Sequence, residues 1–181
     1  MRKEAPMRFD MYGLIHKAQR KYLFDLSSLL AKMDPKDEQH WQEVETKLTW
    51  IVEHLKQHAH SEKTYIFPLI QAVSNTHESL DAQHHDQDEE LDKLLALSQK
   101  RDAKKLYSAL NLFIASYLQH QAEEEQNQED VIWKHYTDAQ ILGAMSKFFA
   151  SKSEEFHTKN AEFVVPTMNI YEIKGFFSRK G

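Results

Sequence analysis

The chain has 181 residues, the length of one ordinary domain with a full hydrophobic core. Its formal net charge of −5, with no basic stretch interleaved with aromatic residues, argues against nucleic acid and anionic membranes as partners. The absence of cysteine excludes disulfides, thiolate catalysis and iron–sulfur clusters, so any metal must be bound by nitrogen and oxygen atoms.

Four long helices are predicted, because the chain has only four glycines and four prolines and its apolar residues recur at helical spacing. Short links between consecutive helices force neighbours to run antiparallel. The predicted fold is therefore all-α, an antiparallel up-down-up-down four-helix bundle that occupies residues 1–136 and is followed by short C-terminal helices. The four helices are expected at residues 8–31, 35–73, 77–99 and 102–129.

Local signals mark where these helices begin and bend. Asp34 is the expected N-cap of the second helix, with Pro35 in its first turn, and Asp102 is the expected N-cap of the fourth. Pro68 lies inside the second helical pattern. Because proline cannot donate a backbone hydrogen bond, we expect a kink one turn beyond Glu62.

Residues 137–181 are predicted to pack on the bundle as a helical extension of the same domain. Thr137 and Gln140 have the spacing of a capping box for a helix to about Ala150, and another helix is expected near Asn169. The extension is rich in phenylalanine, which predicts that it caps one end of the bundle, with a homodimer contact as the alternative. These side chains are Phe148, Phe149, Phe156, Phe163, Phe176 and Phe177.

The first residues, MRKEAPMRFDMYG, contain no apolar stretch of the signal-peptide type. No later segment has 18 uncharged apolar residues in a row, which a membrane-spanning helix needs. We therefore expect a cytoplasmic protein, either a monomer or a homodimer, that has neither a membrane nor a nucleic acid as its partner.

The second and fourth predicted helices share one spacing: His58 precedes Glu62, and His120 precedes Glu124, by four residues. Four residues make about one helical turn, so each imidazole lies beside its carboxylate on one helix face. Both pairs continue an apolar stripe, and a buried carboxylate without a partner costs several kcal/mol. This pattern predicts a metal cation between the two pairs. The apolar residues of the stripes are Leu48, Ile51 and Leu55 before the first pair and Leu106, Leu110, Phe113 and Tyr117 before the second.

The third helix contains three histidines that are candidates for the same site. His84 shares a face with apolar residues and is preferred, whereas His85 shares its line with Asp81 and Asp92. His85 remains an alternative, because a half-turn difference in helix rotation would exchange the two. His77 lies on the line of His84 but close to the helix start. The apolar residues on the preferred face are Leu80, Leu91 and Leu95.

On the first helix the candidate is His16, which lies seven residues from both Phe9 and Leu23 and therefore on their face. Glu123 and Glu125 flank a predicted ligand and are expected to form an ordinary charged surface. The remaining histidines fall on polar or terminal positions and are expected to be solvated. They are His40, His54, His60, His135 and His157.

The pattern of His-x-x-x-Glu on the second and fourth helices, with one candidate histidine ligand from each of the first and third, resembles the hemerythrin-like family of HHE cation-binding proteins. The order is the reverse of the Glu-x-x-His of ferritin-like carboxylate proteins. The resemblance covers most of the chain. The similar segments are Ile15-His-Lys-Ala-Gln-Arg20, His58 through Phe67-Pro68, His120-Gln-Ala-Glu-Glu-Glu125, Ile132-Trp133 and Tyr136-Thr-Asp138.

This resemblance implies a non-haem diiron centre, with two iron ions and a bridging oxo, hydroxo or water ligand. It implies that the four histidines are terminal ligands and that the two glutamates bridge. Nitrogen and oxygen ligation suits iron, with zinc or manganese as possible substitutes. The implied ligands are His16, His58, Glu62, His84, His120 and Glu124.

The chain also departs from the oxygen-carrying hemerythrins. These carriers have a second histidine one turn after the first on the third helix, where this chain has Asp88 or Glu89, and a longer His-to-Asp spacing on the fourth. Stable oxygen carriage is therefore not expected. The leading hypothesis is a diiron protein that binds, senses or reduces oxygen, nitric oxide or peroxide in redox or nitrosative stress. The alternatives are an iron-handling or repair protein and a module with a structural metal.

Overall fold

The computed structural model describes the backbone of residues 8–178 and the side chains of residues 8–174. All regular elements within these residues are helical, which confirms the all-α prediction. The four long helices are α1 (Gly13–Lys32), α2 (Glu38–Tyr65), α4 (His77–Gln99) and α5 (Ala103–Asn127). The shorter elements are α3 (Phe67–Gln71), the π-helical segment η1 (Gln128–Ile132), α6 (Trp133–His135), α7 (Asp138–Ala150), α8 (Glu154–Val164), the 3₁₀ turn η2 (Val165–Thr167) and α9 (Ile170–Ser178).

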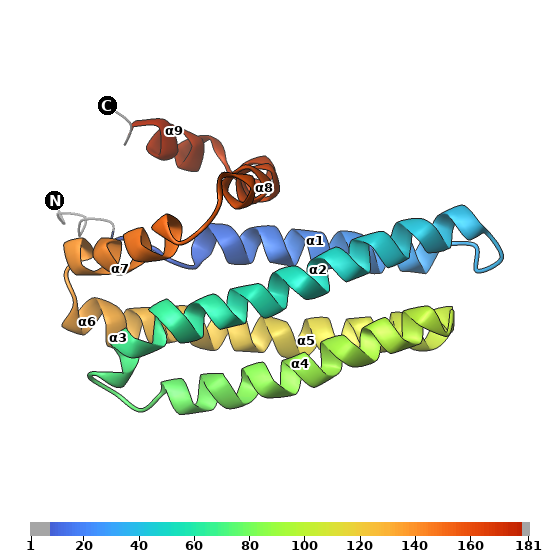
Figure 1. The fold of residues 1–181 in the computed structure, drawn as a ribbon, viewed down its shortest axis with the longest axis horizontal. Coiled ribbons are helices and arrows are strands. Elements are labelled where there is room, and N and C mark those ends of the chain that lie inside the picture. The colour runs from blue at the N-terminus through green and yellow to red at the C-terminus, as the bar shows by residue number, and fades with distance from the viewer. Residues whose placement is uncertain (1–7, 179–181) are drawn as a thin grey trace, which may run out of the picture.

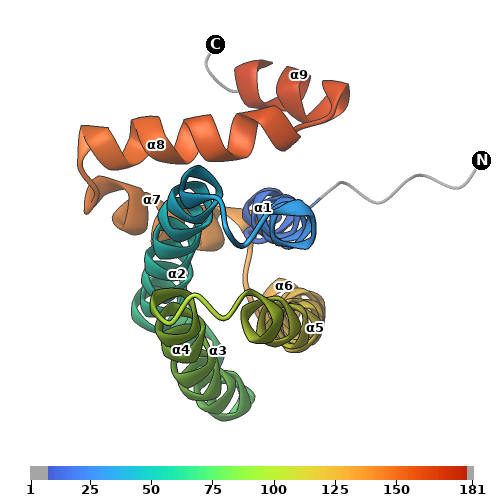
Figure 2. The same ribbon diagram turned by 90° about the vertical axis from the view of Figure 1, so that its right-hand side faces the viewer.

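The long helices lie side by side and surround one interior (Figure 1). α1 contacts α2, α2 contacts α4, α4 contacts α5, and α5 contacts α1, which closes the ring. Figure 2 views the bundle from the end at which the short connections 33–37 and 100–102 join the helices in pairs. Among the described residues, no helix is both long enough and apolar enough to cross a membrane.

The apolar interior is divided into two parts. The larger cluster fills the bundle toward the two short connections and includes Leu26, Leu48 and Leu110. The smaller cluster lies at the other end and includes Tyr12 and Phe67. The histidines and glutamates of the predicted site lie between the two clusters along the helices, so a polar layer interrupts the core.

The helix boundaries follow from local capping. The Asp102 carboxylate accepts the backbone N–H of Lys105, which confirms it as the cap of α5. The capping box of Thr137 and Gln140 is also confirmed. α2 ends before Ile66, and α3 begins with Pro68 in its first turn, so the predicted break is present.

Two boundary predictions were wrong, and one helix was missed. α1 begins at Gly13 rather than at residue 8, because the Asp10 carboxylate binds the first backbone N–H groups and stops the helix there. α2 is capped by Asp37, whereas Asp34 accepts from a backbone N–H inside the connecting turn. Helix α8 was not anticipated; Ser153 caps it.

The C-terminal helices lie along one side of the bundle. α7 contacts α2, α8 contacts α1, and Figure 2 shows α8 lying across both long helices. Phe163 packs against Tyr22, Trp50 and His54 on this side, rather than over an end of the bundle. The side chains of Phe176 and Phe177, predicted to take part in this packing, lie outside the described residues.

Leu110 and Leu112 on α5 provide a matched test of the core. Leu110 is fully buried, whereas the side chain of Leu112 is 69% exposed. We expect Leu110→Ala to lower the free energy of unfolding by about 2–5 kcal/mol, because it leaves a cavity in the larger cluster. Leu112→Ala should change it by less than about 0.5 kcal/mol. Urea unfolding followed by circular dichroism measures both, and equal losses would contradict this description of the core.

Candidate metal centre

All six predicted ligands lie together in the polar layer between the two apolar clusters. Five of them are buried, and His58, with 14% of its side chain exposed, is the most accessible. Each long helix contributes at least one of them. His16 comes from α1, His58 and Glu62 from α2, His84 from α4, and His120 and Glu124 from α5.

The six residues form two overlapping groups, each able to surround a metal ion. Within each group, one ligand atom from every residue lies within 4.8 Å of the others. Glu62 and Glu124 belong to both groups. The first group, here called position 1, consists of His16, His58, Glu62 and Glu124, and the second, position 2, consists of Glu62, His84, His120 and Glu124.

Each glutamate directs its two oxygens toward different positions. Glu62 places Oε1 at 3.1 Å from Nε2 of His58 and Oε2 at 3.3 Å from Nε2 of His84. Glu124 does the same from the other side of the bundle. Its Oε2 lies 3.3 Å from Nε2 of His16, and its Oε1 lies 3.1 Å from Nε2 of His120. Each carboxylate therefore faces histidines of both groups.

The two positions also correspond to two helical hairpins. The α1–α2 hairpin supplies both histidines of position 1, and the α4–α5 hairpin supplies both histidines of position 2. Each hairpin adds one glutamate, which lies within ion-pair distance of a histidine of the other hairpin. The centre thus lies at the junction of the two halves of the bundle.

The donor set fits a metal ion. All four carboxylate oxygens of Glu62 and Glu124, and Nε2 of His16 and His58, are buried without a hydrogen-bond partner among the described residues. Buried carboxylates left in this state are costly, whereas a cation would coordinate these atoms directly. Imidazole and carboxylate ligands without thiolate suit iron, manganese or zinc.

The histidines and glutamates shift one another's pKa in the metal-free protein. Burial lowers the pKa of His16, but the nearby carboxylates of Glu124 and Glu125 outweigh it and raise the pKa to about 9. The pKa of His84 is also raised to about 9, since Glu124 and Glu62 outweigh its burial. Burial raises the pKa of Glu124, but His120 and the other histidines bring it well below its usual value.

Side chains outside the six hold two of the histidines in place. Nδ1 of His16 lies 3.0 Å from Oε1 of Glu125, and Nδ1 of His120 lies 2.7 Å from Oε1 of Gln83. An oxygen at Nδ1 favours the tautomer with its proton there, which leaves the Nε2 lone pair free for a metal. Arg20 donates to the same oxygen of Glu125 at 2.6 Å.

A set of hydrogen-bonded side chains connects the centre with the larger apolar cluster. Oε1 of the buried Gln19 accepts from the hydroxyl of Tyr117 at 3.1 Å and from Nε2 of Gln121 at 2.8 Å. Gln121 in turn accepts from Nε of Arg20 at 2.8 Å. These bonds satisfy the polar atoms that the centre introduces next to the core.

The three histidines of the third long helix lie in different surroundings. His84 is buried in the cluster, with its ring stacked on Phe67 at 5.6 Å, whereas 76% of the His85 side chain is exposed. His77 contacts Phe67 and belongs to neither ligand group. Of the three, only His84 belongs to a candidate ligand group.

Two expectations from the sequence were wrong. Glu125 is not an ordinary surface charge, because it faces the buried His16. His54 is not solvated: it packs between Trp50 and Phe163, and burial lowers its pKa to about 3. Glu125 continues the line of Gln121 one turn later, but spacing alone did not distinguish it from the exposed Glu123.

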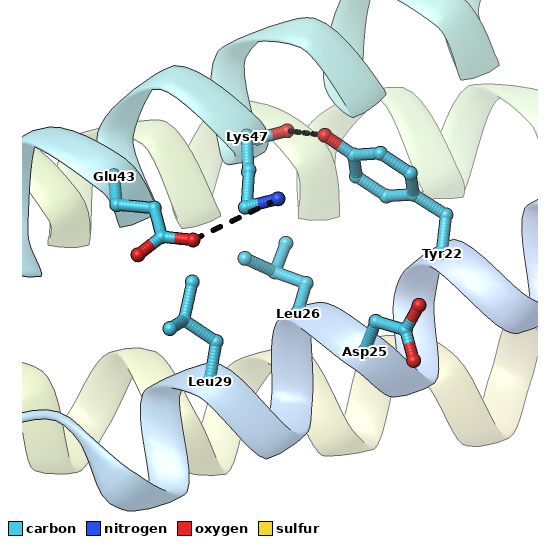
Figure 3. A pocket seen from close by; sticks show the side chains of 6 residues that line it. All are labelled: Tyr22, Asp25, Leu26, Leu29, Glu43 and Lys47. Atoms are coloured by element: carbon cyan, nitrogen blue, oxygen red, sulfur yellow. Dashed lines mark hydrogen bonds and ion pairs between the residues drawn. The ribbon is translucent and has the colours of Figure 1, made fainter. Parts of the chain in front are cut away.

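The predicted ligands do not line the cavity shown in Figure 3. This cavity has a volume of about 250 Å³ and lies between α1 and α2, toward the short connections. There the hydroxyl of Tyr22 donates to the backbone carbonyl of Lys47 at 3.2 Å. Its lining consists of Tyr22, Asp25, Leu26, Leu29, Glu43 and Lys47. The candidate centre is instead a packed layer of side chains.

Residues 9–132 match the family model described as the Hemerythrin HHE cation binding domain. The chain belongs to this family. The match confirms the resemblance seen in the sequence. The matched residues include the four long helices and all six candidate ligands. Comparisons with curated proteins and with solved structures gave no significant match.

The role of Gln19 can be tested by replacement with leucine. Gln19→Leu leaves the Tyr117 hydroxyl and the Gln121 amide without their buried acceptor, so we expect the free energy of unfolding to fall by about 1–3 kcal/mol. Gln42→Leu, the same change at an exposed position of α2, should cost less than about 0.5 kcal/mol. Urea unfolding of the metal-free proteins compares them, and equal effects would contradict a role for Gln19 as acceptor.

The pKa values predict how the metal-free protein responds to pH. His16 and His84 bind protons more tightly in the folded state, with pKa values of about 9, than the ordinary value of 6.5. Their contribution to stability is thus complete below pH 6.5 and is lost as the pH rises toward 9. We expect the urea midpoint to fall over this range.

His84→Gln should make this decline shallower, whereas His85→Gln, its exposed neighbour, should leave it unchanged. A midpoint that is constant or rises from pH 6.5 to 9 would show that the buried histidines are neutral in the metal-free protein.

Proposed function

We propose that this hemerythrin HHE domain holds a non-haem diiron centre in an up-down-up-down bundle, with one iron ion at position 1 and one at position 2. The proposal includes a bridging oxo, hydroxo or water ligand and a role in binding or sensing oxygen, nitric oxide or peroxide under redox or nitrosative stress. The orientation of Glu62 and Glu124 carries this proposal. In each glutamate, one oxygen faces a histidine of position 1 and the other faces a histidine of position 2.

The number of ligands supports a centre that takes up small molecules. Each position has two imidazoles and shares two carboxylates, which amounts to four protein ligands. Iron with such ligands retains open coordination sites, and when bound it would supply redox chemistry toward oxygen-containing or nitrogen-containing ligands. The protein side chains hold the histidines, share the carboxylates and limit the space around them.

The surroundings restrict which ligands can reach the centre. Tyr12 stacks on His16 at 4.9 Å, and Phe67 stacks on His84, so aromatic rings cover one histidine of each position. Both rings belong to the smaller apolar cluster, which closes this end of the bundle. A diatomic molecule or peroxide suits such an enclosed site, whereas a large organic substrate does not.

Metal content provides the first test. Protein purified without air from iron-replete cells should contain about two irons per chain by elemental analysis. His58→Ala and His120→Ala each remove a ligand of one position and should reduce the content to about one or below. His60→Ala and His135→Ala, at exposed positions, serve as matched controls and should keep the parent content. Parent-like iron in the two ligand variants would overturn the proposal.

Ligand titrations distinguish the proposed role from the alternatives. A visible absorption band that changes on anaerobic addition of nitric oxide, or on addition of oxygen or peroxide, supports binding at the irons. Transfer of iron to a metal-free acceptor protein would instead indicate iron handling. An unresponsive spectrum, together with unfolding on metal removal, would indicate a structural metal.

A further inference from the structure

The two candidate positions differ in the groups that support their histidines. In position 1, Nδ1 of His16 faces a carboxylate, Oε1 of Glu125, at 3.0 Å. In position 2, Nδ1 of His120 faces a neutral amide oxygen, Oε1 of Gln83, at 2.7 Å. Nδ1 of His84, the other histidine of position 2, is buried without a partner among the described residues.

We propose that Glu125, held by Arg20, makes position 1 the tighter of the two metal positions and leaves position 2 the more easily emptied. This inference rests on the proposed function, because it ranks the two sites of the same centre. Glu125 acts through His16 and is therefore a positioning residue. The expected order is that the first metal ion binds at His16 and His58.

A carboxylate at Nδ1 strengthens a ligating imidazole more than an amide does. It fixes the ring orientation, holds the proton on Nδ1 and increases the electron density available at Nε2. Removing such a partner weakens metal binding by about 10–100-fold. Glu125 would also bring a negative charge near a cation bound by His16, whereas Gln83 brings no charge.

Arg20 holds Glu125 in place without cancelling its effect. It donates to the oxygen that faces His16, at 2.6 Å, and it is itself fixed by the bond to Gln121. About a third of the Arg20 and Glu125 side chains is exposed, whereas that of His16 is fully buried. Solvent therefore screens the ion pair on its outer side, while the contact with His16 lies within the protein.

The test uses cobalt(II) as a spectroscopic probe, added under anaerobic conditions to the metal-free full-length protein. The parent should show two dissociation constants. Glu125→Gln, which keeps an acceptor but removes the charge, should weaken the tighter site by about tenfold and leave the weaker one unchanged. Gln83→Ala should weaken only the second. Glu129→Gln removes the same charge at an exposed position in η1, which follows α5, and is the control.

Single-position variants assign these constants to the two sites. In a His120→Ala background, which leaves position 1 intact, Glu125→Gln should weaken cobalt binding. In a His58→Ala background, which leaves position 2 intact, only Gln83→Ala should do so. Circular dichroism verifies that each variant is folded. If a background binds no cobalt, the two constants of the otherwise intact protein decide the result.

The outcomes separate this inference from the proposed function. Two bound cobalt ions, with Glu125→Gln no different from Glu129→Gln, would overturn the ranking and leave the two-metal centre standing. Equal weakening of both dissociation constants by Glu125→Gln would also overturn the ranking. Loss of a negative charge would then weaken both positions alike, without a specific effect through His16. A parent protein that binds no metal would overturn the proposed function itself.

Discussion

The burial of Glu62 and Glu124 in the middle of the bundle is the constraint on which the rest of the structure depends. A carboxylate this far from water is stable only beside positive charge or hydrogen-bond donors, and the bundle interior provides four histidines at ion-pair distance. The apolar clusters on either side provide the packing energy that an all-polar interior would lack. The histidines thus stabilise the buried carboxylates, and the apolar clusters stabilise the bundle that holds them.

The transition from core to centre is gradual. Tyr117, a member of the larger cluster, and Gln121, next to His120 in the chain, both donate to Gln19, so hydrogen-bonded side chains link the cluster to the centre. On the other side, Phe67 reaches His84 because the break between α2 and α3 redirects the chain at this point. Pro68, which ends the long helix, therefore helps to place an aromatic ring on a candidate ligand.

The fold class and most of the candidate site were predictable, because helical periodicity relates sequence spacing to faces. The spacing of His58 and Glu62, and the apolar neighbours of His84, were enough to place these residues inside the bundle. Contacts between different helices carry no such signal. Glu125 is distinguished from Glu123 by its contact with His16, which lies on another helix. His54 is covered by Phe163 of α8, a helix that was not anticipated.

The pairing of hairpins has a consequence for how the chain is connected. Residues 33–37 and 100–102 each join helices within one hairpin, so within the bundle only α3 and the short stretch after it, residues 72–76, join α1–α2 to α4–α5. Each hairpin contains two histidines and one glutamate of the centre. A chain cut within 72–76 would become two separate peptides, neither of which contains a complete position. The centre could then form only when the two peptides associate, because each position needs ligands from both.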